Sequence, residues 1–309
     1  ADYDNGIAAL SNFPRITQCT TGEAIDAVEG RLESVYKGRL GRFSRSFIFM
    51  KPDYLVLYDN IEARHPESYN WLFHAVGDSI RPDGNSIRIV RPKAQLRIEI
   101  LDPDHLKGAI RKYPDSENRF IDLSSGAPTS DTTFLAVMIP ARTDQQAQRD
   151  QWRAEGLHLP GWVGARVLRD GLTDEILFRT GGEKSTSAGT FITDADRLTT
   201  TRNKAGALKR LWMRNASMLA KAGRDTETTL VRLESSATMA FRWEPGSILV
   251  ETDSPSDQKL TLWLRQAPSR LELDGLAQEL DYDSRTERLT LHLPEGRHVI
   301  RFDRGALDW

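Results

Sequence analysis

The chain has 309 residues, 39% hydrophobic and 28% charged, which is enough apolar material for one large domain or two ordinary ones. Its 42 basic and 44 acidic residues leave a net charge of −2, without the strong positive field typical of proteins that bind nucleic acid or an anionic membrane. The single cysteine, Cys19, excludes an intramolecular disulfide and a metal cluster built on cysteines. We therefore expect neither nucleic acid nor membrane as a partner.

Residues 1–16 contain neither the basic nor the apolar region of a signal peptide, and no apolar run is long enough for a membrane helix. We expect the chain to be a mature form or a fragment.

Residues 23–38 support two interpretations. Apolar residues recur at helical spacing, whereas Gly30 in the middle suits two strands joined by a turn. The pattern alone slightly favours the helix.

Residues 42–75 contain three short apolar runs rich in β-branched and aromatic side chains. The runs are Ser46–Met50, Tyr54–Tyr58 and Tyr69–Phe73. A Lys-Pro-Asp turn and a polar stretch separate them, a pattern that predicts strands packed in a sheet. The third run ends at His74, the main candidate for a functional residue.

The pattern of strands continues through residues 78–140. Residues 82–85, Pro-Asp-Gly-Asn, predict a hairpin turn, and residues 94–101 alternate apolar with polar as a half-buried strand does. Residues 102–131 are rich in proline and glycine and predict loops. Residues 133–140 predict a buried strand.

The stretch Gly181–Gly189 has the composition of a linker or long turn. We therefore expect one β-sandwich region over residues 1–180. Continuing antiparallel sheets or a second small β domain are expected over residues 181–309.

Residues 204–222 suit a helix and a strand hairpin equally well. Elsewhere short strands recur at roughly ten-residue spacing with few helices, which predicts an all-β fold of large, stacked antiparallel sheets.

The stretch 42–75 resembles the heparinase II/III-like family of polysaccharide lyases. The resemblance rests on Arg45 before a strand, Lys51-Pro52-Asp53-Tyr54, the strand Val56–Ile61, and Trp71-Leu72-Phe73-His74. It is clear over about residues 24–75, weaker to residue 180 and architectural beyond. It also shifts the expectation for residues 23–38 from helix to strands.

The resemblance implies the β-sandwich part of a lyase whose N-terminal (α/α) toroid carries most catalytic residues. Such enzymes act on uronic-acid polysaccharides by β-elimination, in the periplasm or outside the cell. The chain alone is then expected to have little or no activity. The alternative is a non-catalytic carbohydrate-binding or structural β-sandwich module, and a sandwich unrelated to sugars stays open because a fold does not fix function.

Within this resemblance, His74 corresponds to a zinc ligand of the zinc-containing members. The residue expected to be a ligand after Gly30 is Arg31, which does not bind zinc, so the site looks incomplete. The alternative is a histidine that caps its strand through hydrogen bonds.

Three further residues are candidates for contact with an acidic sugar. Tyr69 and Trp71 would stack on sugar rings, or else fill the core as buried aromatic residues. Arg45 would meet a uronate, or else form a salt bridge or stay solvated.

Overall fold

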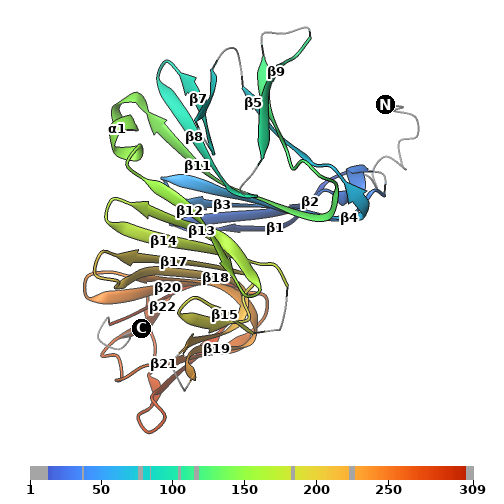
Figure 1. Ribbon diagram of the computed structural model, residues 1–309. Helices are drawn as coiled ribbons and strands as arrows, with labels where there is room; N and C mark the ends of the chain where they lie inside the picture. The colour runs from blue at the N-terminus through green and yellow to red at the C-terminus, as the bar shows by residue number, and fades with distance from the viewer. Residues whose placement is uncertain are drawn as a thin grey trace. The chain divides into compact units, whose positions relative to one another are not determined.

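The computed structural model describes residues 13–36, 38–75, 79–83, 85–103, 106–114, 118–181, 185–222 and 227–303. Antiparallel strands make up most of it and helices are limited to single turns, so the predicted all-β fold of stacked sheets is confirmed (Figure 1). The chain forms two compact units, Ala1–Gly156 and Leu157–Trp309. The predicted boundary at residues 181–189 lies inside the second unit, where the strands on either side pair with each other.

The first unit is built on an eight-stranded sheet with the order β1-β2-β3-β4-β11-β8-β7-β6. Its strands are β1 (Arg15–Thr21), β2 (Ile25–Arg31), β3 (Leu40–Met50), β4 (Tyr54–Glu67), β6 (Ile80–Asp83), β7 (Ser86–Arg91), β8 (Ala94–Asp102) and β11 (Thr129–Arg142). The predicted Lys-Pro-Asp turn joins β3 to β4, and the N–H of Asp53 closes it by donating to the Met50 carbonyl at 2.7 Å.

A second sheet of three strands has the order β5-β10-β9. Its strands are β5 (Asn70–Ala75), β9 (Lys107–Lys112) and β10 (Arg119–Ser124). The third apolar run of the sequence therefore belongs to a different sheet from the first two. The prediction of loops over residues 102–131 is wrong for β9 and β10. These strands contain charged residues and a glycine, so their sequences do not show a clear alternation of apolar and polar residues.

The two sheets of the first unit pack face to face. Trp71, Phe73 and Ile121 of the smaller sheet share a core with Phe43 and Phe134 of the larger one. The Trp71 and Phe134 rings stack with centroids 5.1 Å apart. This contact makes the unit a small sandwich.

Residues 23–38 form β2 and then a short 3-10 turn, η2 (Glu33–Tyr36). Ile25 and Ala27 are buried and their neighbours are not, which is the two-residue period of a strand. The strand expected from the resemblance is thus confirmed over β2, and the helix favoured by the apolar spacing is wrong. The polar stretch 141–160 contains η3 (Thr143–Gln145), α1 (Gln146–Arg149) and β12 (Arg153–Leu159).

The second unit contains a fifteen-stranded sheet. The division between the two units falls within β12, the first strand of this sheet. Its main path is β12-β13-β14-β17-β18-β19-β20-β26-β22-β23. The remaining bounds are β13 (Trp162–Arg169), β14 (Leu172–Arg179), β15 (Thr186–Ala188), β16 (Phe191–Thr193), β17 (Arg197–Asn203), β18 (Leu208–Ala222), β19 (Glu227–Trp243), β20 (Ser247–Ser254), β21 (Gln258–Trp263), β22 (Leu271–Leu273), β23 (Leu276–Ala277), β24 (Asp281–Asp283), β25 (Arg288–Leu293) and β26 (Gly296–Asp303).

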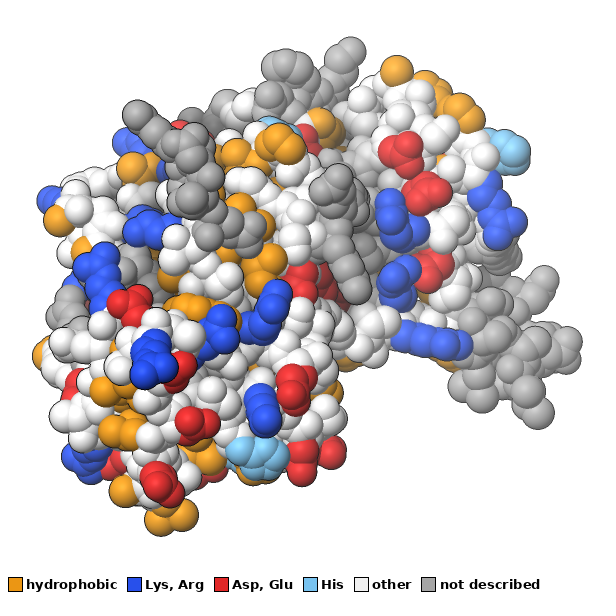
Figure 2. All heavy atoms as spheres, turned by 90° about the horizontal axis from the view of Figure 1, so that it is seen from below, with side chains coloured by type: hydrophobic (Ala, Val, Ile, Leu, Met, Phe, Trp, Pro, Cys, Tyr) orange, Lys and Arg blue, Asp and Glu red, His pale blue; other side chains and the backbone are white. Residues whose placement is uncertain are grey.

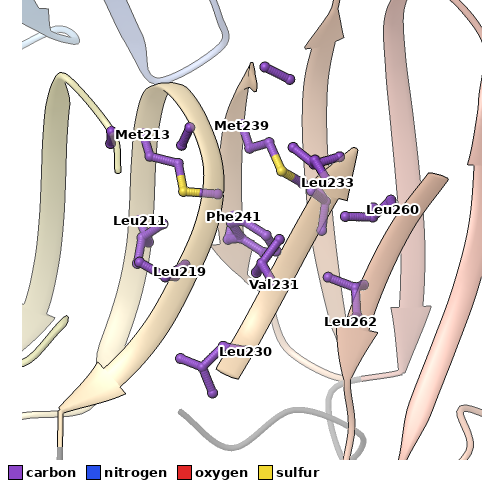
Figure 3. Packing of buried hydrophobic residues seen from close by; sticks show 14 of the residues in the cluster. Leu211, Met213, Leu219, Leu230, Val231, Leu233, Met239, Phe241, Leu260 and Leu262 are labelled. Carbon is purple, nitrogen blue, oxygen red and sulfur yellow. The ribbon is translucent and has the colours of Figure 1, made fainter. Parts of the chain in front are cut away.

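Two long strands fold this sheet over its own core. One half of β18 pairs with β17 and the other with β16, while β19 pairs with β20 and β21 in the same divided way. The register of β18 shifts around Asn215, whose φ of 51° suits an asparagine in the left-handed region. Side chains such as Met213, Phe241 and Leu262 gather in the core between the strands (Figure 3). Neither the helix nor the hairpin expected over residues 204–222 forms.

Candidate functional site

A hollow of about 460 Å³ lies in the first unit, beside β5 and the facing parts of β3 and β4. Arg45, Tyr69, Trp71 and His74, which the sequence singled out from one stretch, all line it. The register places Arg45, Asp59 and Phe134 in one row across three neighbouring strands. The sandwich therefore brings the four candidate residues to one site, while their roles stay predictions.

Arg45 and Asp59 form a bidentate ion pair in this hollow. The Arg45 Nε and Nη2 atoms donate to the two Asp59 carboxylate oxygens at 2.7 and 2.6 Å. Asp59 is completely buried, whereas the Arg45 side chain is 31% exposed. The salt-bridged alternative for Arg45 is therefore confirmed, and its Nη1 has no partner among the described residues.

Burial and pairing act in opposite directions on these two groups. Burial raises the pKa of the Asp59 carboxyl, and the Arg45 guanidinium and the Trp71 indole oppose that rise. Burial is also the largest single influence on Arg45 and works against its charge, but the hydrogen bond with Asp59 and the charge of that carboxylate, with a smaller contribution from Tyr36, together outweigh it, so the pKa of Arg45 is raised. Arg45 thus stays a cation with a fixed orientation.

A second bidentate pair lies in the same hollow. Arg39 donates through Nε and Nη2 to the Glu67 carboxylate at 3.0 and 2.6 Å. The hydrogen bond holds the pKa of Glu67 below its ordinary value. The two arginines and the two carboxylates balance, so the hollow carries no net charge from these four groups.

Tyr69 and Trp71 are mainly core residues. They are 8% and 4% exposed, and Trp71 also packs edge-on against Phe73 at 4.8 Å. Burial, followed by the negative charges of Glu67 and Asp131, raises the pKa of Tyr69. The phenol therefore stays protonated, and its hydroxyl donates a hydrogen bond to the Ser130 carbonyl at 3.4 Å.

His74 lies on the opposite face of β5 and is exposed. Its Nδ1 is hydrogen bonded to the Tyr113 hydroxyl at 2.8 Å, and its ring contacts Tyr113 and Phe120. His74 is therefore hydrogen bonded, as in the alternative to zinc binding. Its partner, Tyr113, was not predicted from the sequence.

The surroundings of His74 do not fit a zinc site. Zinc in proteins is held by cysteine, histidine and carboxylate side chains, usually in a tetrahedron. Across the described ranges, no three such side chains converge in a way that could hold a metal. Zinc binding by His74 stays a prediction without support from neighbouring ligands. His105, another histidine of the sequence, lies outside the described residues.

Several residues of the hollow were not predicted from the sequence. Tyr36, Arg39 and Glu67 line it together with Phe43. Arg39 and Glu67 are 28 positions apart, and only the pairing of β3 with β4 brings them together. The only sequence feature that could have pointed to these residues is the presence of polar side chains near strand ends. This feature is too common to identify a site.

No family model matches the chain, and no curated protein matches it in sequence. Among solved structures it is similar to the heparan sulfate lyase of Pedobacter heparinus, with 14% identity and a TM-score of 0.41 over 55% of this chain and 28% of that one. The chondroitin AC lyase of Streptomyces coelicolor A3, in complex with chondroitin sulphate, has 12% identity and a TM-score of 0.42 over 92% and 35% of the two chains. A single-residue variant of that enzyme has a TM-score of 0.43.

This chain thus spans only 28–35% of the length of those structures. Similarities with TM-scores this low assign neither a family nor a function. The described part of the chain has no helix of the length and apolarity needed to cross a membrane.

Proposed function

We propose that this chain is the β-sandwich part of a polysaccharide lyase that cleaves a uronic-acid-containing polysaccharide by β-elimination. In this proposal an N-terminal (α/α) toroid of the complete protein carries the main catalytic residues, and the sandwich supplies one wall of the substrate cleft. The protein works in the periplasm or outside the cell, where such polymers occur. The observation that carries the proposal is the convergence of Arg45, Tyr69, Trp71 and His74 on one hollow.

The chemistry of elimination suits the residues of the hollow. A base removes the proton from C5 of the uronate, the bond from C4 to the glycosidic oxygen breaks, and a double bond forms between C4 and C5. The leaving oxygen takes up a proton. Negative charge develops on the carboxylate side of the sugar, and preorganised donors stabilise it. The Nη1 group of Arg45 is a donor of this kind, and the hydroxyl of Tyr69 would become one if it turned from the Ser130 carbonyl to the sugar.

The test is an elimination assay on the full-length protein with alginate, heparan sulfate and hyaluronan. The ultraviolet absorbance of the unsaturated uronate product reports cleavage. We expect product with at least one polymer, and less product from an Arg39→Gln variant. Absence of product with every uronate polymer contradicts a lyase.

The second candidate is a non-catalytic carbohydrate-binding module, and the charge balance of the hollow favours it. Both arginines are already neutralised by carboxylates, so the attraction for a uronate is weaker than for two unpaired cations. Binding of oligosaccharides by the full-length protein without any unsaturated product supports this candidate over the lyase.

A further inference from the structure

Three aromatic rings form a cluster on the outer face of the three-stranded sheet. Phe120 of β10 lies directly across from His74 of β5, and Tyr113 follows β9 on the same side. The ring centroids are 5.0 Å apart for Tyr113 and Phe120, 5.5 Å for His74 and Phe120, and 5.8 Å for His74 and Tyr113. We refer to these three residues as the ring platform.

The ring platform is not part of the core. Tyr113 is 39% exposed, His74 is exposed and Phe120 is half-buried. The opposite face of the same sheet supplies Trp71 and Phe73 to the core. Apolar surface left in water costs about 25 cal/mol per Å² relative to burial. A cluster of exposed rings therefore points to a ligand rather than to folding.

Polar groups surround the rings. The Tyr113 hydroxyl and His74 Nδ1 share a hydrogen bond, and the planes of the two rings are 23° apart. The Nε2 atom of His74 has no partner in the part of the chain that the structure describes. Arg111, whose side chain is 61% exposed, lies across from Phe120 and pairs with Asp122 at 2.9 Å. Apolar ring faces thus lie next to hydrogen-bonding groups and a cation.

A pyranose ring fits this combination. One face of the sugar presents C–H groups that pack on aromatic rings, while its hydroxyl groups project outward toward hydrogen-bonding neighbours. A carboxylate on the sugar suits a guanidinium such as that of Arg111. A flat lipid surface or an apolar protein face makes no use of these polar groups.

We propose that the ring platform is a second sugar-stacking subsite, which binds a further unit of the same acidic oligosaccharide that occupies the hollow. The two sites share His74, which lines the hollow and also contacts the other two rings of the platform. The inference rests on the proposed function, since it takes the ligand of the hollow to be a uronate chain. It assigns Tyr113 and Phe120 a role in recognising longer chains.

Calorimetric titration of the full chain with disaccharides and hexasaccharides of hyaluronan, heparan sulfate and alginate tests this inference. Tyr113→Ala is expected to weaken hexasaccharide binding about tenfold, the order that loss of one aromatic stacking contact gives. The same change should weaken disaccharide binding in the hollow much less, although Tyr113 contacts His74 at the edge of the hollow. Tyr113→Phe keeps the ring and retains most of the affinity. Phe13→Ala removes another exposed aromatic ring, 55% exposed, and serves as the matched control.

The outcomes separate the inference from the proposed function. If Tyr113→Ala leaves the hexasaccharide affinity unchanged, the ring platform is not a subsite, and the proposed binding in the hollow is unaffected. An equal loss for disaccharide and hexasaccharide also overturns it, since the platform is then no separate subsite. Loss with Tyr113→Ala but not with Arg39→Gln, a change in the hollow, supports the platform and contradicts the hollow. Absence of binding of any of these sugars by the unaltered chain overturns both.

Discussion

At the scale of single residues, Arg45 shows how one side chain serves fold and site together. Two of its nitrogens donate to the fully buried Asp59, and the third, Nη1, is the donor that the proposed function assigns to a sugar. Without Asp59, a half-buried guanidinium on β3 would have neither a fixed orientation nor a counter-ion. The ion pair is thus the structural condition for Arg45 to act as a donor in the hollow.

Replacing Arg45 by methionine should therefore destabilise the protein strongly. Asp59 would keep its buried position but lose its counter-ion, and breaking such a pair costs about 3 kcal/mol in the free energy of unfolding. The pKa of Asp59, already raised by burial, would rise further. Asp59 takes up a proton as the pH falls through this raised value, so the loss should shrink in acid.

Urea unfolding of Arg45→Met at neutral and acidic pH measures this. The matched control is Arg42→Met on the same strand, because Arg42 pairs with Glu62 at 3.4 Å and the two side chains are 40% and 51% exposed. Its effect should stay within about 0.5 kcal/mol. Equal losses for the two variants would contradict the role given to the buried pair.

His74 provides a second prediction at this scale. Elemental analysis of purified protein should give the same zinc content for the unaltered chain and His74→Ala, because its ring partners are Tyr113 and Phe120. His65→Ala, a change of another exposed histidine, is the control for adventitious zinc. One zinc per chain lost only with His74→Ala would establish the histidine as a ligand.

At the scale of elements, β5 separates a buried face from a solvent-exposed face. Trp71 and Leu72 are neighbours in sequence, yet Trp71 is 4% exposed and Leu72 is 44% exposed. Trp71→Ala should lower the free energy of unfolding by about 3–5 kcal/mol. Leu72→Ala should change it by no more than about 0.5 kcal/mol. Similar values for the two in urea unfolding would mean that Trp71 is not the core contact between the sheets.

β13 and β14 allow a test of strand pairing in the second unit. A Cβ atom at Gly164 would lie 2.0 Å from the Ile176 backbone carbonyl oxygen, a contact that only backbone movement relieves. Gly164→Ala should therefore cost about 3 kcal/mol of unfolding free energy. At Gly41 the nearest atom would be at 3.8 Å, so Gly41→Ala should be nearly neutral and serves as the control. A neutral Gly164→Ala in thermal or urea unfolding would contradict the close pairing.

Elements were predicted well where the sequence itself carries their period or turn. The hairpin of β3 and β4 and the strand β8, predicted over residues 94–101, are examples. Prediction failed where pairing between strands that are distant in sequence determines the length of a strand. β18 and β19 are long because different partners extend them at each end. For the site, Arg45, Tyr69, Trp71 and His74 came from one stretch, but Glu67 and Tyr113 enter through tertiary contacts that no local pattern encodes.

At the scale of the whole molecule, charge is balanced. The net charge is −2, and on the face shown in Figure 2 basic and acidic side chains are interspersed rather than gathered by sign. Long-range attraction therefore contributes little to binding of an acidic polymer. Under the proposed function, selectivity would come from short-range contacts in the hollow and on the ring platform.

Removing one carboxylate from the hollow should consequently increase its affinity for an acidic sugar. Glu67→Gln keeps the side-chain volume and a hydrogen-bond acceptor for Arg39 but leaves its guanidinium charge unbalanced. One additional net positive charge near the ligand is expected to strengthen binding of uronate oligosaccharides roughly fivefold at low salt. The gain should fade as the ionic strength rises, because the hollow is open to solvent and salt screens it.

Titrations at several salt concentrations measure both effects. Glu62→Gln makes the same change in net charge on the same strand, but Glu62 pairs with Arg42 and does not line the hollow. It should leave the affinity nearly unchanged. An equal gain for both variants would mean that net charge alone attracts the polymer. No gain for Glu67→Gln would mean that the bound sugar does not meet Arg39, which removes this part of the hollow from the binding site.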